Sequence, residues 1–252
     1  MSDLFSSKLS DHDHESVTVR DKNLSSEVMG EMDFGGAVYL LLTGEEPTAG
    51  ESRLVNAMLS SLMVHGMTPH AIATRMTLLS EPNSTQGAIA SGILGVGSQF
   101  AGAMEQSARD LQSIDEADNP DQAVKDLVAD YRERGDPFSG IGHPSFDPVD
   151  PRAQRLFSLA EETDIAGTHV DILHEIQSLF EEETGLDLPV NVTGAIAAVS
   201  SDMGLSPEAA RGFAVVSRAA GLLGEVVEEK ESPMAMDLWQ LIDENTSHGT
   251  DD

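Results

Sequence analysis

The sequence predicts an all-α protein, and three observations support this class. Hydrophobic residues make up 40% of the 252 residues but aromatic residues only 4%, so the core consists of smaller side chains that suit closely packed helices. No segment shows a convincing strand-like alternation of apolar and polar residues. Apolar residues instead recur at helical spacing, as they do at Phe213, Val216, Ala220, Leu223 and Val227.

Capping residues indicate where the helices begin and end. The apolar run at 34–43 is closed by Gly44, which predicts a buried helix that stops there. Ser206 and Pro207 suit the cap and the first position of another helix. Further helices are predicted at 51–64, 121–134, 151–163, 168–184 and 193–203, with a small-residue helix at 88–104.

The N-terminal segment, residues 1–28, is expected to be irregular. It contains an acidic and histidine-rich cluster at 11–15, which allows a metal-site interpretation. We favour a solvated, flexible terminus because no apolar residues surround the cluster. No metal site is therefore predicted.

The charge balance restricts the possible functions. Asp and Glu number 44 against 14 Lys and Arg, for a net charge of −30. Adaptation to a cytosol rich in salt, which screens self-repulsion, is favoured over a calcium-binding or nucleic-acid-mimic surface. DNA or RNA binding is disfavoured because a phosphate backbone needs a cationic surface.

The absence of cysteine excludes disulfides, thiolate catalysis and thiolate zinc sites. No stretch of about 18 apolar residues is present, and residues 1–20 are too polar for a signal peptide. The sequence therefore predicts no membrane association and a cytoplasmic location.

One loop combines the residue types of a ligand site. Gly140, Ile141 and Gly142 directly precede a histidine, so the backbone there can approach a ligand closely and offer N–H groups. Nine residues after His143, Arg152 can bind a carboxylate with two hydrogen bonds. Spacing alone leaves a plain loop with a helix start equally open.

Two further residues are candidates. His65 follows an apolar helix, where a histidine is more often a core or capping residue than a ligand. Arg218 lies among small apolar residues and therefore needs an anion, either Glu225 or a substrate carboxylate.

Together these segments resemble the citrate synthase family. The run at 38–48 resembles the family's YLLLTGELPT segment, and 65–75 resembles its DHG and TAR motifs. The loop and helix start at 140–153 resemble its GHR and DPRA motifs. The segments 191–194 and 217–219 resemble NVDG and SRA. Five motifs in order cover the chain from about residue 28.

The resemblance implies an all-α, citrate synthase-like fold with a large and a small helical domain and an active site in the cleft between them. The large domain is expected at 29–104 and 205–252 and the small domain at 105–204. The resemblance also implies a homodimer that acts on an acyl-CoA and a dicarboxylate, without a metal ion.

Residue roles follow by position. The resemblance implies that His143 hydrogen-bonds the ketone or hydroxyl oxygen of the oxaloacetate half. It implies that Arg152 and Arg218 hold carboxylates and that His65 contacts the same half. Coenzyme A is expected at Gly140, Ile141, Gly142 and Phe100.

Several positions depart from the family pattern. Phe100 replaces the histidine that polarises the thioester, and Thr193 replaces the catalytic aspartate. Pro144 and Asp147 stand where a cation usually follows the loop histidine, and 228–234 contains no arginine. An ordinary citrate synthase is therefore disfavoured, because a threonine cannot act as a carboxylate base.

The sequence instead favours a citryl-CoA lyase, because the chain resembles stand-alone citryl-CoA lyases and the lyase module of ATP-citrate lyase. His143 would take the hydroxyl proton, and Glu225 or a water held by Thr193 would protonate the enolate. The alternatives are a lyase for a smaller substrate such as citramalyl-CoA, a citrate synthase-like acyltransferase, and a non-catalytic dicarboxylate-binding paralogue.

Overall fold

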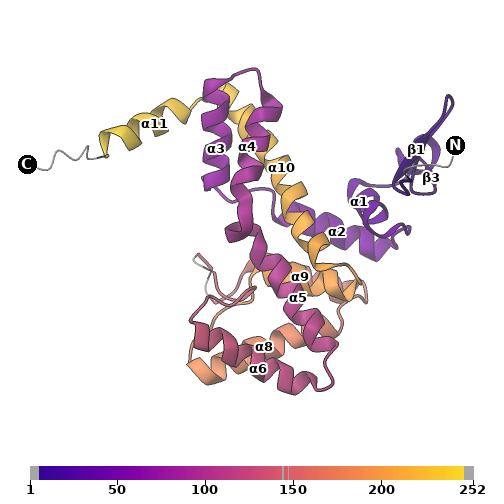
Figure 1. Ribbon diagram of the computed structural model, residues 1–252, viewed down its shortest axis with the longest axis vertical. Coiled ribbons are helices and arrows are strands. Elements are labelled where there is room, and N and C mark those ends of the chain that lie inside the picture. Colours follow the sequence, from indigo (N-terminus) through magenta and orange to yellow (C-terminus); the bar gives the residue numbers. More distant parts are fainter. Residues whose placement is uncertain (1–5, 144, 147, 247–252) are drawn as a thin grey trace, which may run out of the picture. The chain divides into compact units, whose positions relative to one another are not determined.

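The computed structural model describes residues 6–143, 145–146 and 148–246, without the side chains of residues 99 and 100. Its regular structure is predominantly helical, which confirms the all-α class (Figure 1). The α-helices are α1 (Phe34–Thr43), α2 (Ala49–Ser61), α3 (Pro69–Ser80), α4 (Thr85–Gly97), α5 (Ala103–Asp115), α6 (Pro120–Arg134), α7 (Pro151–Glu162), α8 (Thr168–Thr184), α9 (Val192–Asp202), α10 (Pro207–Glu231) and α11 (Ala235–Glu244), and two short π-helices are η1 (Leu24–Val28) and η2 (Ser98–Gly102).

Local capping residues define the helix ends, including the predicted stop at Gly44. Asp33 begins α1 by accepting a hydrogen bond from the Gly36 N–H at 2.8 Å. Gly44 ends α1 in the left-handed conformation, with φ of 82°. Gly135 and Gly185 end α6 and α8 in the same way. Glycine adopts this conformation without the steric cost that a Cβ brings, which explains why the sequence located these ends well.

The predicted helix at 88–104 is divided in the structure. The helix α4 ends at Gly97, and η2 follows before α5 begins at Ala103. Gly97 has a φ of 48°, which is incompatible with a continuing α-helix. The apolar pattern continues across the break, so sequence periodicity alone did not reveal it.

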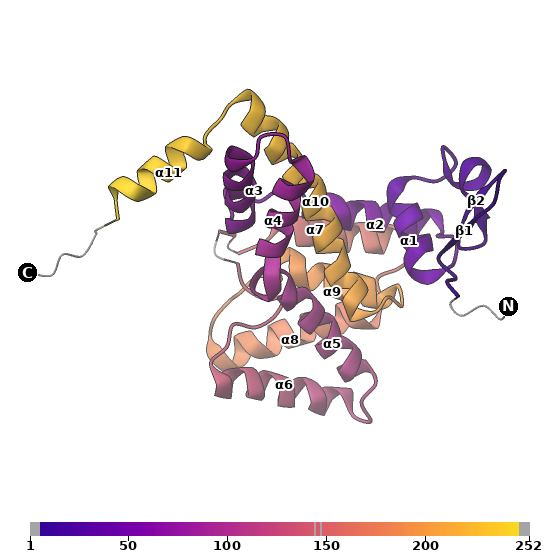
Figure 2. The same cartoon turned by 45° about the horizontal axis from the view of Figure 1, so that its top comes forward.

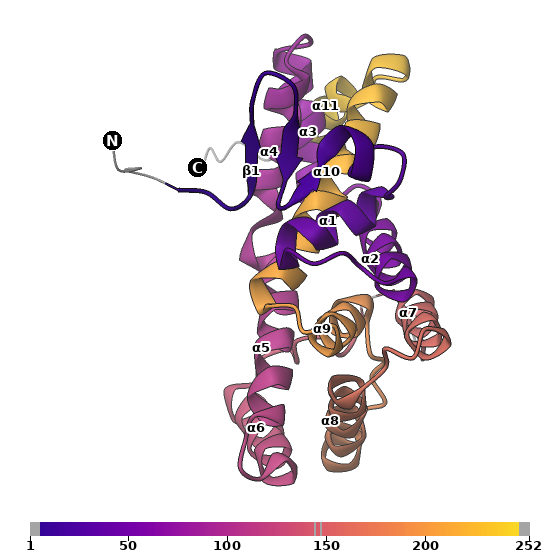
Figure 3. The ribbon, with the colours of Figure 1, turned by 90° about the vertical axis from the view of Figure 1, so that its right-hand side faces the viewer.

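The N-terminal segment was wrongly expected to be irregular. It forms a three-stranded antiparallel sheet of β1 (Ser10–His12), β2 (Val17–Val19) and β3 (Lys22–Asn23), in the order β1-β2-β3 (Figure 3). The strands are two or three residues long; β1 is exposed, β2 and β3 are mostly half-buried, and none of their residues is fully buried. Because they bury little surface, they carry no apolar alternation for the sequence to show.

The chain separates into two compact units. Unit 1 contains Met1–Ser61 and Ala103–Phe213, and unit 2 contains Leu62–Gly102 and Ala214–Asp252. The domain boundaries implied by the family resemblance remain a prediction.

Unit 1 is organised around α9. This helix contacts α5, α7 and α8, and α6 contacts α8 (Figure 2). Its residues 195–199 are completely buried. They are alanines apart from Ile196 and Val199, and such small side chains allow neighbouring helices to pack closely around α9.

Unit 2 contains the pair α3 and α4, which lie side by side (Figure 1). Gly92 allows their close approach, because a Cβ on this residue would lie 2.1 Å from Thr74 Oγ1. A buried apolar cluster joins α3, α4 and α10 through Leu78, Ala88 and Val226, respectively. Within the described part of the chain, the helices lack the combination of length and apolar character needed to cross a membrane.

Candidate functional site

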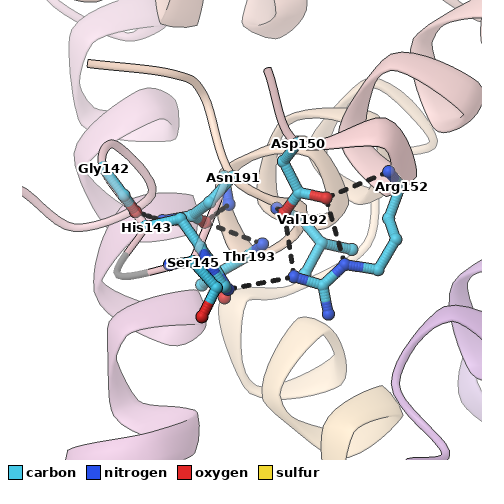
Figure 4. Close-up of polar contacts among 9 residues, drawn as sticks. Gly142, His143, Ser145, Asp150, Arg152, Asn191, Val192 and Thr193 are labelled. Carbon is cyan, nitrogen blue, oxygen red and sulfur yellow. Dashed lines mark hydrogen bonds and ion pairs between the residues drawn. The ribbon is translucent and has the colours of Figure 1, made fainter. Parts of the chain in front are cut away.

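The loop that ends at His143 is attached to the segment before α9. The Gly142 N–H donates to the Pro189 carbonyl at 2.7 Å, and the Asn191 N–H donates to the Gly140 carbonyl at 3.0 Å. The Asn191 side chain also donates to the Gly142 carbonyl, at 2.7 Å (Figure 4). Three hydrogen bonds therefore hold the loop glycines in place.

Two glycines bring the loop against the first turn of α9. Gly140 has a φ of 91°, and a Cβ there would lie 2.7 Å from the Gly194 Cα. A Cβ on Gly194 would lie 2.4 Å from the Gly140 carbonyl oxygen. Ile141, between the loop glycines, is buried and pairs with Val190 in an antiparallel bridge. The loop keeps this position only because neither glycine carries a side chain.

The start of α9 is defined by Asn191. Its side-chain oxygen accepts hydrogen bonds from the Thr193 N–H at 2.9 Å and the Gly194 N–H at 3.1 Å. This arrangement is an ordinary helix N-cap. It places the half-buried Thr193 in the first turn of α9, next to the loop that carries His143 (Figure 4).

Asp150 is completely buried and connects Arg152 to α9. Its Oδ1 accepts from Arg152 Nε at 3.0 Å and its Oδ2 from Arg152 Nη2 at 2.9 Å. Its Oδ2 also accepts from the Val192 N–H at 2.9 Å. Burial raises the pKa of Asp150, but these hydrogen bonds outweigh burial and hold the pKa below its ordinary value. Asp150 therefore remains ionised and fixes Arg152.

His143 lies between two hydrogen-bond donors. The Ser145 N–H lies 3.0 Å from His143 Nδ1, and Arg152 Nη2 lies 3.3 Å from His143 Nε2 (Figure 4). The ring of Phe146 packs against the imidazole, with ring centroids 4.5 Å apart. The same ring lies 5.1 Å from the centre of the Arg152 guanidinium. Phe146 thus supports both polar side chains.

These two contacts correspond to two tautomers of His143. A neutral imidazole has one N–H and one acceptor nitrogen, so only one of the two donors is bound at a time. When Ser145 binds Nδ1, the Nε2–H becomes a donor beside Arg152. When Arg152 binds Nε2, this nitrogen carries the lone pair of a potential base. The arrangement therefore suits a ligand oxygen that gains or loses a proton.

In unit 2, Gly221 brings the segment after α2 against α10. A Cβ on Gly221 would lie only 1.8 Å from the Met63 carbonyl oxygen. One helical turn earlier, Arg218 Nη1 lies 3.5 Å from the same oxygen. His65 lies two residues after Met63 and is exposed. The close helix contact thus places both predicted residues of unit 2 in one region.

The pKa of His70 depends on the charges in that region. Burial lowers its pKa to about 4, with further contributions from the charges of Arg218 and His65. Its Nε2 lies 2.7 Å from Thr68 Oγ1. A neutral buried His70 therefore lies within electrostatic range of Arg218 and His65, the two predicted substrate-binding residues of unit 2.

Arg75 forms a separate buried cluster in unit 2. It is 1% exposed and forms ion pairs with Glu225, Glu228 and Glu229 of α10. Glu225, one of the two anions considered for Arg218, is therefore bonded to Arg75, with a distance of 2.7 Å to Nε. Glu229 Oε1 also accepts the backbone N–H of Ala235 at 2.9 Å. This cluster joins α3, α10 and the start of α11.

Comparison with protein families identifies the chain. Residues 11–237 match the family described as citrate synthase, C-terminal domain. The chain belongs to the citrate synthase family. This membership confirms the resemblance drawn from the five sequence motifs.

Individual relatives refine the comparison. The structure resembles citryl-CoA lyase from Hydrogenobacter thermophilus with a TM-score of 0.88 and 31% identity, covering 99% of this chain and 96% of the other. It also resembles Methanosaeta concilii ATP citrate lyase, solved in complex with (3S)-citryl-CoA, with a TM-score of 0.79 and 21% identity, over 99% of this chain and 42% of the other. The latter similarity supports the fold alone.

Curated sequence relatives carry a different name. Citrate synthase from Haloferax volcanii is 30% identical over 197 residues, which is 76% of this chain and 50% of the relative. Citrate synthase from Deinococcus radiodurans is 28% identical over 205 residues, which is 79% of this chain and 52% of the relative. The chain therefore spans about half the length of these citrate synthases.

The predicted residues fall into both units. Unit 1 brings together His143, Arg152, Thr193 and the loop glycines, while unit 2 holds His65 and Arg218. Phe100 lies in η2, but its side chain is outside the described residues, as are Pro144 and Asp147. Among the described residues, no group of three or more His, Asp or Glu side chains is placed so that it could hold a metal ion.

Two residues of the site were missed by sequence reasoning. Asp150 was identified only as a possible helix start, although it is the buried partner of Arg152. Asn191 was noted in a motif, without the role of holding the loop at Gly142. The position of Asp150 directly before Pro151 and Arg152 was a signal that the sequence did contain. The spacing of residues did not reveal that the Asp150 carboxylate also reaches α9.

Proposed function

We propose that the chain is a CoA-dependent carbon–carbon lyase that converts citryl-CoA to acetyl-CoA and oxaloacetate. The observation that carries this proposal is the match to a citryl-CoA lyase over nearly the full length of both chains. The replacement of the family aspartate by Thr193 also argues against deprotonation of acetyl-CoA.

The proposed reaction proceeds in two proton transfers. His143 Nε2 takes the tertiary hydroxyl proton in the tautomer in which it has a lone pair. As the ketone of oxaloacetate forms, the carbon–carbon bond breaks and its electron pair moves into the thioester carbonyl. The resulting enolate takes up a proton and leaves as acetyl-CoA. The thioester acts as the electron sink, so the proposed steps use no metal ion.

Arg152 has a directional role in this scheme. Its Nε and Nη2 hold Asp150, and Nη2 also lies beside His143 Nε2, which leaves Nη1 for a substrate oxygen. A donor fixed in this way is already oriented before the negative charge develops on the oxygen. We propose that Arg152 binds a carboxylate of the oxaloacetate half next to the oxygen held by His143.

The other predicted residues complete the proposal. We propose that Arg218 binds a substrate carboxylate, that His65 contacts the oxaloacetate half, and that Gly140, Ile141 and Gly142 line the coenzyme A site. Phe100 is proposed to contribute to the coenzyme A site. A water molecule held by Thr193 is proposed to protonate the enolate, because Glu225 is engaged by Arg75.

A cleavage assay tests the function. The purified protein in concentrated KCl is given citryl-CoA, citramalyl-CoA and malyl-CoA separately, and release of acetyl-CoA is measured. We expect cleavage of citryl-CoA and a loss of at least about 10²-fold in His143→Ala. His174→Ala, which changes an exposed histidine of α8, is the matched control and should retain activity.

The alternatives are distinguished by the same assay. Preferential cleavage of citramalyl-CoA would favour the smaller substrate, in line with the absence of arginine from 228–234. Citrate formation from oxaloacetate and acetyl-CoA would favour an acyltransferase. Binding of dicarboxylates without turnover of any substrate would identify a non-catalytic paralogue. Full activity in His143→Ala would contradict the assigned base.

We also propose that the protein forms a homodimer in a salt-rich cytoplasm. The helix α4 contains no charged residue, although 23% of the chain is charged. Leu94 on this helix is 84% exposed, which suits a surface that a second, equally acidic copy can approach without repulsion. Light scattering in concentrated KCl should give the dimer mass, and a monomer would contradict the proposal.

A further inference from the structure

Most cations of this protein are already bound to its own acids. In the described residues, at least eight of the ten arginines have a carboxylate within ion-pair distance, and Lys22 has two. The eight are Arg53, Arg75, Arg109, Arg132, Arg134, Arg152, Arg155 and Arg211. With 44 acidic residues against 14 basic ones, these pairs leave a large excess of negative charge.

The loop site follows the same pattern. The segment 140–151 contains no Lys or Arg. The nearest cation in sequence, Arg152, is paired through two nitrogens with the buried Asp150, so the pair has no net charge. Arg132 and Arg134 at the end of α6, before this loop, hold Glu183 and Asp130. In the described part of unit 1, this loop and its neighbouring arginines therefore offer hydrogen-bond donors but no net positive charge.

Coenzyme A is a poor electrostatic match for such a surface. Its phosphate groups are multiply negative, and the protein carries a net charge of −30. The field of a highly charged protein changes the local concentration of a charged ligand by roughly 10- to 10³-fold. Here the field opposes binding. Dissolved salt reduces the opposition, because the Debye length falls from about 10 Å at 0.1 M to about 3 Å at 1 M.

From these contacts we infer that screening by dissolved cations controls binding of the coenzyme A portion of the substrate. This inference rests on the proposed function for the identity of the ligand. It reverses the usual behaviour of phosphate-binding proteins, whose affinity falls as salt rises because basic side chains bind the phosphates. In this protein the affinity rises with salt, because the opposing field is screened and few cationic contacts are lost.

Calorimetry of ligand binding tests the inference without depending on turnover. The dissociation constants of coenzyme A and of 3′-dephospho-coenzyme A are measured over the salt range in which the circular dichroism spectrum is unchanged. Between about 0.3 M and about 2 M KCl, the Kd of coenzyme A should fall roughly tenfold. The Kd of the dephosphorylated ligand, which has less charge, should fall by a smaller factor.

Choline chloride distinguishes screening from a specific ion site. At equal concentrations it should lower the Kd of coenzyme A as much as KCl does, because both salts screen alike. An effect of KCl alone would overturn the inference in favour of a potassium site. If salt changed the Kd of coenzyme A and of 3′-dephospho-coenzyme A by the same factor, the inference would be overturned in favour of a general effect of salt on the protein. Absence of coenzyme A binding at every salt concentration would also overturn it.

A local charge variant sharpens the test. The Leu188 side chain lies against the loop, 3.7 Å from where a Cβ on Gly142 would stand, and Leu186, two residues earlier, is 54% exposed. Leu186→Lys should lower the Kd of coenzyme A at low salt and weaken its salt dependence. Leu9→Lys adds the same charge to another exposed position, next to β1. Equal effects of the two variants would contradict a local field at the loop.

The test of salt-dependent binding can fail or succeed independently of the test of the proposed lyase function. Salt-dependent binding of coenzyme A without cleavage of any thioester would support the inference and reject the lyase. Cleavage of citryl-CoA with binding that weakens as salt rises would support the lyase and overturn the inference.

Discussion

Asp150 and Arg152 are two residues apart, yet they form a two-point ion pair in which the carboxylate is completely buried. The same carboxylate accepts the backbone N–H of Val192 at the start of α9. One side chain thereby fixes the predicted carboxylate-binding arginine and the helix that carries Thr193. The site depends on this connection, because Arg152 and Thr193 come from separate segments of unit 1.

Replacement of Asp150 by Asn should therefore weaken both stability and binding. The variant keeps the shape of the side chain but leaves the Arg152 charge without its partner, which costs about 3 kcal/mol when the pair is buried. Urea unfolding measures this loss, and calorimetry should show weaker binding of oxaloacetate. Asp136→Asn is the control, because Asp136 is exposed and pairs with Arg134 at 3.4 Å, so its loss should cost less than about 1 kcal/mol. Equal losses in the two variants would contradict a special role for Asp150.

The helices were predictable because their boundaries depend on local chemistry. Asp33 and Gly44 act on backbone groups within a few residues, so the sequence contains their full signal. The break at Gly97 and the sheet at β1–β3 were missed for the opposite reason. Gly97 interrupts an apolar pattern that continues into α5, and the strands bury too little surface to require a pattern.

The site was predictable only in part. His143 and Arg152 were identified from their residue types and from the family motifs, and the structure places Arg152 Nη2 3.3 Å from His143 Nε2. The roles of Asp150 and Asn191 depend on contacts across 42 and 49 residues of sequence. No local pattern specifies such contacts. The same reason explains why Glu225 was considered for Arg218 rather than for Arg75.

The contact between Gly140 and Gly194 should be sensitive to a single methyl group. Gly194→Ala places a Cβ 2.4 Å from the Gly140 carbonyl oxygen, so the loop must move away from α9. We expect a loss of about 1 to 3 kcal/mol in urea unfolding and a loss of oxaloacetate binding. Gly212→Ala is the matched control, because a Cβ at this position of α10 would meet no atom within 4 Å apart from its chain neighbours and the backbone of its own helix. That change should stabilise the protein by up to about 1 kcal/mol. Normal ligand binding by Gly194→Ala would show that the close contact is dispensable.

The Arg75 cluster should hold α11 in place. Glu229 bonds Arg75 with one oxygen and the Met234 and Ala235 N–H groups with the other. Glu229→Gln removes the charge and should loosen α11, lowering the fluorescence anisotropy of Trp239, the single tryptophan of the chain. Glu228→Gln is the matched control, because the Glu228 side chain is 60% exposed and such pairs contribute less than about 1 kcal/mol. Unchanged anisotropy in Glu229→Gln would contradict this anchoring role.

His70 should make unit 2 sensitive to acid. Burial, aided by Arg218 and His65, lowers the pKa of His70 to about 4 from its ordinary 6.5. Between these values the unfolded chain binds a proton that the folded chain does not, so folding becomes less favourable as the pH falls from 6.5 to 4. Across this window the loss amounts to roughly 3 kcal/mol. Above it both states are neutral at this position, and His70 adds no further pH dependence.

Urea unfolding isolates the contribution of His70 to the pH dependence of stability. The wild type and His70→Gln are compared in concentrated KCl, near neutral pH and near the acid end of this window. Trp239 fluorescence follows unit 2, because Trp239 and His70 both belong to it. The variant is expected to be less stable at neutral pH, where it loses the contact to Thr68. It should nevertheless lose less stability than the wild type on acidification, because its amide does not titrate. The same acid-induced loss in both proteins would show that His70 titrates normally in the folded state.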